Sequence, residues 1–290
     1  MKAIRNLIIT LVVIVAILGV VIIGGYVYVR TTYGIDLFRT AGQLKTLTQA
    51  VDENALCPNA FGEEDFVAME TELNKKFDGF VSHEEGKGFN GYSVNFDALN
   101  GKVMADMISL TEKQVGAVAQ TVFYEQTGGK IKLGDKEMSV TVMQVDFSEI
   151  AANGSADFNV VAKLDLTPFK ADMGGFPYKY FKKYIPDNLY VSSTVRVDKT
   201  EEDGFSYKVS HKSVTLNNLS ADDTADLFNT LNAVLKIGTA ENLNMQVGET
   251  AVNALIGTKD NPGFAYSMKA IGAKYFMFAT SADADRFIVN

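Results

Sequence analysis

The stretch FNVVAKLDL, residues 158–166, decides the fold class, because every even-numbered position in it is apolar. A second stretch, LYVSSTVRV at residues 189–197, shows the same alternation. A period of two is typical of strands that pack one face on a core and expose the other face to water. We therefore expect a mainly antiparallel sheet in the centre of the chain.

Further segments with strand character flank these two on both sides. Adjacent apolar pairs, Val142-Met143 and Val160-Val161, interrupt the alternation and indicate either β-bulges or burial on both faces of the sheet. The further predicted strands are residues 92–96, 102–110, 138–147, 205–216, 274–280 and 287–289.

Amphipathic helices interrupt the predicted sheet. Residues 110–115, LTEKQV, combine the Thr-to-Gln spacing of a capping box with a hydrophobic staple between the first and last residue. Residues 220–223, SADD, open a second helix, and a short third helix is expected from Glu249 to Ile256. The predicted fold class is α+β, with a single amino-terminal transmembrane helix followed by a mainly antiparallel sheet that packs on two amphipathic helices.

The amino terminus carries a long apolar segment. Residues 7–29 contain no charged side chain and are flanked by Arg5 and Arg30. At about 1.5 Å per residue, this segment covers roughly 34 Å, enough to cross a bilayer core of about 30 Å. A cleaved signal peptide would have a shorter apolar region and a small-x-small cleavage site. We therefore expect residues 7–29 to be an uncleaved anchor in the lipid bilayer.

The anchor predicts where the rest of the chain lies. Long segments that follow a first apolar helix usually translocate, so we expect a cytoplasmic tail at residues 1–6 and the body outside the cell membrane. A cytosolic body on a reversed anchor is the alternative. Apolar residues at helical spacing predict a helical juxtamembrane stalk over residues 30–80, followed by an extracytoplasmic α+β domain over residues 81–290. The residues that predict the stalk helices are Leu44, Leu47 and Val51, then Phe66, Met69, Leu73 and Phe77.

Charge and composition exclude several classes of function. The 290 residues include 27 Lys and Arg against 35 Asp and Glu, and two of the basic residues precede the anchor, which leaves the body with a net charge of -10. Such a body repels nucleic acid, so no nucleic-acid partner is expected. A single cysteine, Cys57, and two histidines, His83 and His211, exclude a disulfide framework and a zinc site built from several cysteines. No metal and no cofactor is predicted.

Several short motifs resemble functional sites, but their context indicates ordinary structure. GKGFNG at residues 86–91 has the glycine spacing of a dinucleotide site, yet a strand follows it where such a site requires a helix. We therefore expect a glycine-rich loop or hairpin turn. His83-Glu84-Glu85 is expected to be a solvated loop, with a cation site as the alternative. The acidic segments at residues 198–204 and 283–285 are expected to be turns.

Neither the lone thiol nor the second histidine has a reactive partner nearby in the sequence. Cys57 is expected to be a packed thiol, with a nucleophile paired to His83 or His211 as the alternative. A structural or surface role is expected for His211. No catalytic residue is predicted, and an extracytoplasmic hydrolase is the least favoured hypothesis.

The segment YKYFKKY, residues 178–184, is basic and aromatic in an otherwise acidic body. Such a cluster suits a lipid headgroup layer or a partner surface, to which it would present Lys179, Tyr180, Lys182 and Lys183. The alternative is a short helix whose aromatic side chains pack inward while its lysines are solvated.

The helix start at residues 110–114 after a predicted strand, and IPDNLYV at residues 185–191 leading into another, carry a resemblance to a known architecture. Over roughly residues 90–220 the chain resembles the tubular lipid-binding (TULIP or SMP-like) fold, and the anchor with such a body is similar to the YpmS-type membrane-anchored proteins. The resemblance implies an apolar groove between sheet and helices that would accept a lipid chain.

Two hypotheses of function follow for a noncatalytic envelope protein. In the first, the body binds a lipid or other apolar ligand in the sheet–helix groove. In the second, it is a cell-envelope scaffold or protein-interaction module with a filled core and no ligand. The candidate groove residues, each also a candidate core residue, are Val115, Val118, Val122, Leu227, Phe228 and Leu231.

Overall fold

The computed structural model describes residues 36–290 except 134–135, 172–181, 201–202 and 236–237. The predicted tail and anchor, residues 1–6 and 7–29, therefore lie outside the described residues. Within the described part of the chain, no helix combines the length and apolar character needed to cross a membrane. The fold is a mixture of helices and antiparallel sheets, as the sequence predicts.

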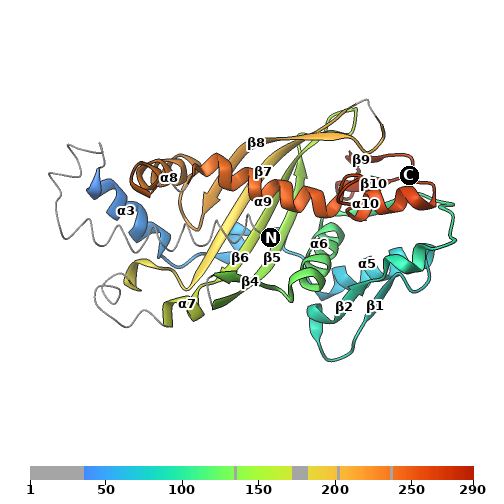
Figure 1. The fold of residues 1–290 in the computed structure, drawn as a ribbon, viewed down its shortest axis with the longest axis horizontal. Helices are drawn as coiled ribbons and strands as arrows, with labels where there is room; N and C mark the ends of the chain where they lie inside the picture. The colour runs from blue at the N-terminus through green and yellow to red at the C-terminus, as the bar shows by residue number, and fades with distance from the viewer. Residues whose placement is uncertain (1–35, 134–135, 172–181, 201–202, 236–237) are drawn as a thin grey trace.

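Ten strands form three antiparallel sheets in the described residues (Figure 1). The largest has five strands in chain order, β4-β5-β6-β7-β8, and the second has the order β3-β10-β9. A separate hairpin pairs β1 with β2. The strands are β1 Val81–His83, β2 Tyr92–Val94, β3 Ile108–Thr111, β4 Lys130–Leu133, β5 Lys136–Ser148, β6 Ala156–Asp165, β7 Asn188–Lys199, β8 Tyr207–Leu216, β9 Phe276–Ala279 and β10 Arg286–Val289.

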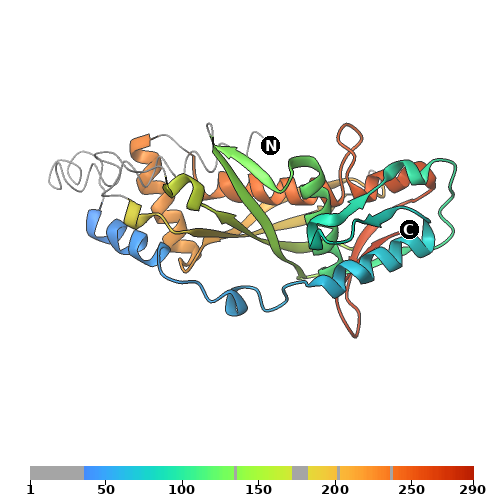
Figure 2. The ribbon, with the colours of Figure 1, turned by 90° about the horizontal axis from the view of Figure 1, so that it is seen from below.

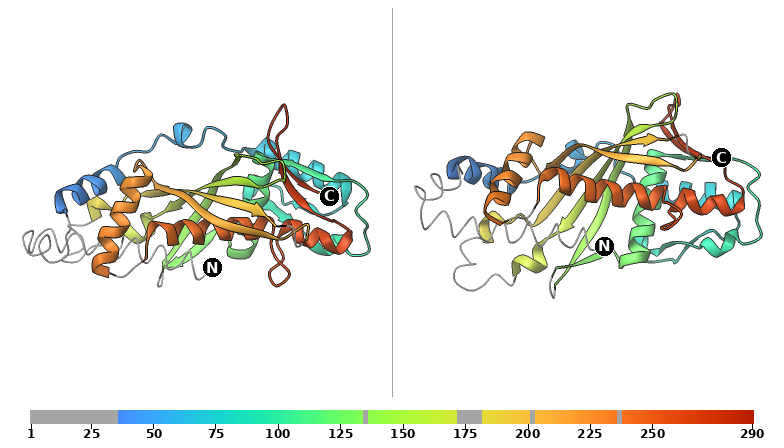
Figure 3. Two further views of the ribbon diagram at one scale, coloured as in Figure 1. Left: turned by 90° about the horizontal axis from the view of Figure 1, so that it is seen from above. Right: turned by 45° about the horizontal axis from the view of Figure 1, so that its top comes forward.

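Helices cover one face of the five-stranded sheet and lie at both of its ends. Figure 2 and both views of Figure 3 show α6 and α9 on one side of the sheet. The helices are α3 Leu37–Leu47, α4 Glu53–Leu56, α5 Glu63–Lys76, α6 Glu112–Thr127, α7 Thr167–Ala171, α8 Ala221–Leu235, α9 Ala240–Leu255 and α10 Phe264–Ser267. The short 3-10 helices are η1 Gly88–Gly91, η2 Phe96–Leu99, η4 Lys182–Tyr184 and η5 Met268–Ile271.

The two apolar pairs in the sheet confirm the two predicted explanations, one each. The register of β5 against β6 shifts between Val142 and Gln144, so Met143 is the extra residue of a β-bulge. By contrast, β6 pairs with β7 without interruption, and Val160 and Val161 are both buried although they point to opposite faces. The second face is covered because the segment between α3 and α5, residues 48–62, crosses it (Figure 2).

Residues 48–62, called the strap below, attach to the polar face of the sheet through side chains. Asn59 donates its backbone N–H to the Gln144 side chain at 2.9 Å. Glu53 forms an ion pair with Lys163 at 2.7 Å and accepts a hydrogen bond from the Tyr190 hydroxyl. These hydrogen bonds lower the pKa of Glu53. The strap therefore belongs to the body.

Two hydrophobic cores lie along the sheet. The larger contains an aromatic group in which Phe278 contacts Phe147, Phe158, Phe276 and Phe287. It also contains Phe66, Met69 and Leu73 of α5, so that part of the predicted stalk is packed into the body. The smaller core joins α3, through Leu44 and Leu47, to α8, through Leu227 and Phe228, and to the ends of several strands of the sheet.

Two sequence predictions were wrong in extent. The strand predicted for residues 102–110 is reduced to Ile108–Thr111, because Val103 and Met107 in the preceding segment are exposed and form no part of a ladder. The short helix predicted from Glu249 is the 16-residue α9, which begins at Ala240. It is α9, rather than α8 alone, that packs with α6 on the five-stranded sheet.

The early start of α9 has a clear local cause. Thr239 caps the helix by accepting from the Asn242 backbone N–H at 3.2 Å, and the Asn242 side chain accepts from the Thr239 N–H at 2.9 Å. Gly248 lies inside this helix although glycine has a low intrinsic helix propensity. In the structure it allows close packing, because a Cβ there would lie 2.2 Å from Cγ1 of Val195 in β7.

Candidate functional site

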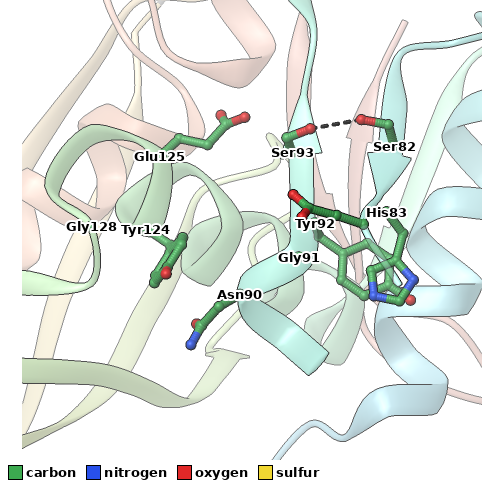
Figure 4. A pocket seen from close by; sticks show the side chains of 10 residues that line it. Ser82, His83, Asn90, Gly91, Tyr92, Ser93, Tyr124, Glu125 and Gly128 are labelled. Atoms are coloured by element: carbon green, nitrogen blue, oxygen red, sulfur yellow. Dashed lines mark hydrogen bonds between the residues drawn. The ribbon is translucent and has the colours of Figure 1, made fainter. Parts of the chain in front are cut away.

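A cleft of about 550 Å³ lies between the β1–β2 hairpin and the carboxyl-terminal end of α6 (Figure 4). We call it the hairpin cleft. Its lining carries hydroxyl, amide, phenol and carboxylate groups beside nearly as much apolar surface. The residues that line it are Ser82, His83, Glu84, Asn90, Gly91, Tyr92, Ser93, Tyr124, Glu125 and Gly128.

The glycine-rich stretch at residues 86–91 builds one wall of this cleft. It connects β1 to β2, which confirms the predicted hairpin turn. Gly86 and Gly88 have positive φ angles of 83° and 53°, which glycine adopts without steric cost. A Cβ on Gly91 would lie 2.5 Å from the backbone oxygen of Glu84, so this position also requires glycine. The stretch is a structural turn with no strand-to-helix geometry for a dinucleotide.

Helix α6 supplies the opposite wall and holds the hairpin in place. The Glu125 carboxylate accepts a hydrogen bond from the Val94 backbone N–H at 2.8 Å. Burial raises the pKa of Glu125 above its ordinary value, and the hydrogen bond from Val94 opposes that change. The Tyr124 ring lies against Gly129, where a Cβ would come within 2.8 Å of Cδ2 of the ring. Glu125 and Tyr124 are therefore both positioned by backbone contacts.

The polar groups of the lining are partly satisfied by one another. The hydroxyls of Ser82 and Ser93 are hydrogen-bonded across the hairpin at 2.7 Å, as Figure 4 shows. Lys87 forms an ion pair with Glu84 at 2.7 Å. Two carboxylates with one nearby ammonium disfavour a phosphate or another anion as the occupant. The lining suits a neutral hydroxyl-rich group or a cationic one.

His83 takes a structural position in this wall. Its ring stacks on Tyr92, with 4.2 Å between ring centroids and 11° between the planes. The Nε2 atom is buried and has no hydrogen-bond partner in the described part of the chain. Of its sequence neighbours, Glu84 pairs with Lys87, and Glu85 is exposed. Among the described residues no three His, Cys, Asp or Glu side chains come together in a way that could hold a metal ion.

The candidate groove residues fall into two separate cores. Val115, Val118 and Val122 of α6 belong to the larger core, with 0%, 1% and 7% of their surface exposed. Leu227 and Phe228 of α8 belong to the smaller core, each 2% exposed. The side chain of Leu231 lies outside what the structure describes. A side chain that lines an open groove has accessible surface, and these five have almost none.

The basic and aromatic segment is only partly described. Lys179 and Tyr180 lie outside the described residues. Lys182 and Lys183 are exposed on η4, where the Lys183 ammonium lies 4.9 Å from the centre of the Tyr184 ring. Helix η4 contacts α3, the first described helix.

The remaining candidate groups have structural roles. Cys57 is a buried free thiol, as expected, and burial raises its pKa to about 11, with Glu53 and Asp146 adding to the effect. Such a thiol is not a nucleophile near neutral pH. Asp283, in the predicted turn, accepts from Ser281 at 2.8 Å and pairs with Arg286. The other acidic turn, residues 198–204, lies partly outside the described residues.

Three polar side chains on the helix side of the sheet resemble a catalytic arrangement without forming one. Asn244 of α9 accepts from the Ser193 hydroxyl at 2.6 Å and contacts Nδ1 of His211 at 2.7 Å. Ser193 and Asn244 are completely buried, and the asparagine separates the hydroxyl from the imidazole. The group ties α9 to β7 and β8.

Ser82, Ser93, Tyr124 and Glu125 were not predicted as site residues. They are isolated polar positions in a hairpin and on a helix, and only the packing of the hairpin on α6 brings them together. The hydrogen bond from Val94 to Glu125 has no signal in the sequence.

No family model, no curated protein and no solved structure matches this chain.

Proposed function

We propose that this chain is a noncatalytic, single-pass membrane protein of the cell envelope whose body is an interaction module, with the hairpin cleft as its binding site. One observation carries the proposal. The interface between sheet and helices is close-packed, whereas the hairpin cleft is open and has polar groups in its lining. This contrast favours the interaction-module hypothesis over the lipid-groove hypothesis.

The arrangement of the two ends supports a tethered module. Residues 7–29 are the anchor, the amino terminus is cytoplasmic and the body lies outside. The described chain starts beside α3, at one end of the long axis, and the β1–β2 hairpin lies at the other end (Figure 1). A partner would therefore meet the hairpin cleft on the side away from the bilayer.

The contacts in the lining support binding rather than catalysis. The Ser82 hydroxyl is hydrogen-bonded to another hydroxyl, not to a base. The Glu84 carboxylate pairs with an ammonium, and one oxygen of Glu125 is occupied by a backbone N–H. Nucleophilic catalysis requires a nucleophile within hydrogen-bond reach of a base, and the contacts of these lining residues do not form such a pair.

Site-specific photocrosslinking on the full chain in its native membrane tests the proposal. A photoreactive residue replaces Asn90, which lines the cleft, and in a matched control it replaces Asn100, which is exposed outside the lining. We expect one discrete crosslinked species at position 90, none at position 100, and loss of the species when Tyr124 is changed to Ala.

Equal crosslinking at both positions, or none at either, would refute the hairpin cleft as the binding site. Native mass spectrometry of the same protein, released from detergent, tests the competing hypothesis. A stoichiometric lipid that remains on the body would support the lipid groove instead.

A further inference from the structure

The end of the body that carries α3 presents an exposed surface made from two segments distant in the sequence. On α3 the residues Phe38, Gly42 and Lys45 recur at helical spacing and are all exposed, Phe38 to 75%. The opposite stripe of α3, with Leu44 and Leu47, is buried in the smaller core. The helix is therefore amphipathic, with an aromatic side chain and a lysine on its outward face.

Helix η4 extends this surface with positive charge. It contacts α3 and exposes Lys182 and Lys183. Arg39 of α3 contributes little free charge, because it forms ion pairs with Asp223 and Asp226 of α8. Lys182 and Lys183 of η4 and Lys45 of α3 are thus exposed on the two elements that make up this end of the body.

The length of chain before α3 limits how far this surface can lie from the bilayer. Six residues, 30–35, separate the end of the predicted anchor from Asp36. A fully extended chain spans at most about 3.6 Å per residue, so Asp36 lies within about 25 Å of the end of the anchor. The side chain of Asp36 caps α3 by accepting from the Phe38 backbone N–H at 3.0 Å, which fixes the start of the helix at this short distance.

We infer that the surface formed by Phe38, Lys45, Lys182 and Lys183 lies against the anionic headgroup layer of the bilayer that holds the anchor. This inference rests on the proposed anchor and adds the orientation of the body. The phenylalanine enters the headgroup and acyl boundary, and the lysines contact anionic headgroups, each lysine adding to the attraction in a salt-dependent way.

The absence of tryptophan from the sequence allows a direct test on the full chain. In Phe38→Trp, the new residue is the only tryptophan and reports its own environment. The protein is reconstituted into phosphatidylcholine vesicles with and without phosphatidylglycerol, and its fluorescence is compared between lipids with brominated and ordinary acyl chains. Phe96→Trp is the matched control, because Phe96 is 37% exposed on η2, beside η5 at the other end of the body.

We expect bromolipids to quench the tryptophan at position 38 several times more strongly than the one at position 96. Adding Lys182→Glu and Lys183→Glu to Phe38→Trp should reduce the quenching in vesicles that contain phosphatidylglycerol and leave it unchanged in phosphatidylcholine alone. Far-UV circular dichroism on each variant shows that the body is folded.

The outcomes distinguish a failure of the docking surface from a failure of the anchor. Equal quenching at positions 38 and 96 in protein that floats with the vesicles would overturn the docking surface while leaving the anchor intact. Quenching at position 38 that ignores both the lysine changes and the lipid charge would overturn the role of η4. Protein that fails to float with the vesicles would refute the anchor itself.

Discussion

Replacing Glu112 by glutamine should stabilise the protein at alkaline pH and have little effect at acidic pH. Glu112 is the first residue of α6, and its carboxylate accepts a hydrogen bond from the Phe147 backbone N–H. Burial raises its pKa from 4.5 to about 7, and the nearby carboxylates of Asp146 and Asp285 act in the same direction. The folded protein therefore holds a proton on this group that the unfolded chain releases.

The sign of the pH dependence follows from that difference. Below about pH 4.5 the group is protonated in both states, so it contributes no penalty. Between pH 4.5 and about pH 7 the unfolded chain loses the proton first, so the free energy of unfolding falls as pH rises. Above pH 7 the penalty is constant.

The magnitude comes from the size of the change in pKa. At about 1.36 kcal/mol per pH unit, moving the pKa from 4.5 to about 7 corresponds to about 3 kcal/mol. The amino-terminal position on a helix favours the charged form by about 0.3–1 kcal/mol. Burial is the larger effect, and we expect a net penalty of about 2 kcal/mol at pH 8.

Glutamine keeps the carbonyl oxygen that accepts from Phe147 and removes the charge. We expect Glu112→Gln to raise the free energy of unfolding by about 2 kcal/mol at pH 8 and by almost nothing at pH 4. Urea titrations followed by far-UV circular dichroism at both pH values measure this. The matched control is Glu241→Gln, which changes an exposed glutamate in the first turn of α9. A gain for Glu112→Gln that is the same at both pH values, or a gain equal to that of the control, would refute the reasoning.

The same structure makes further predictions for a pair of glycines, for a buried asparagine and for the single thiol. Gly248→Ala should destabilise the protein by about 1–3 kcal/mol, because the new Cβ would overlap Val195. Gly42→Ala is the control: a Cβ there has no other atom within 4 Å, so this change should stabilise the protein by about 0.5–1 kcal/mol in the same urea titration. Asn244→Ala should cost about 1–3 kcal/mol, because it removes the side-chain acceptor 2.6 Å from the buried Ser193 hydroxyl and the donor 2.8 Å from the Thr194 carbonyl. An unchanged midpoint would show that the group is dispensable. Cys57 should react with a maleimide at pH 7 only in denaturant, and rapid labelling of the folded protein would contradict its burial.

Elements that carry their own local signal were predictable from the sequence. The alternation at residues 158–166 became β6, and the capping box at Thr111 became the start of α6, with Thr111 accepting from Gln114 at 3.2 Å. Period-two strands and capped helices can be predicted because a few adjacent residues contain the whole pattern. The strap was less predictable, because its attachment through Glu53 and Asn59 depends on partners more than 80 positions away in the sequence.

Two glycines inside helices have roles that the neighbouring sequence does not predict. Gly248 in α9 and Gly116 in α6 weaken the helical pattern, and in isolation each predicts a less stable helix. In the structure both allow close contact: a Cβ on Gly116 would lie 2.3 Å from the Phe61 ring, as one on Gly248 would lie 2.2 Å from Val195. The hairpin cleft depends on long-range packing in the same way.

The sheet gives the two ends of the body a fixed separation. β7, with 12 residues at about 3.3 Å each, is roughly 40 Å long, and the strap runs along the polar face of the same sheet. Because α3 and the α6 wall of the hairpin cleft both pack on this sheet, bending between them would break strand pairing and strap contacts together. A surface held on the headgroups at the α3 end would therefore place the hairpin cleft at a constant height above the bilayer, where only partners that reach that height could occupy it.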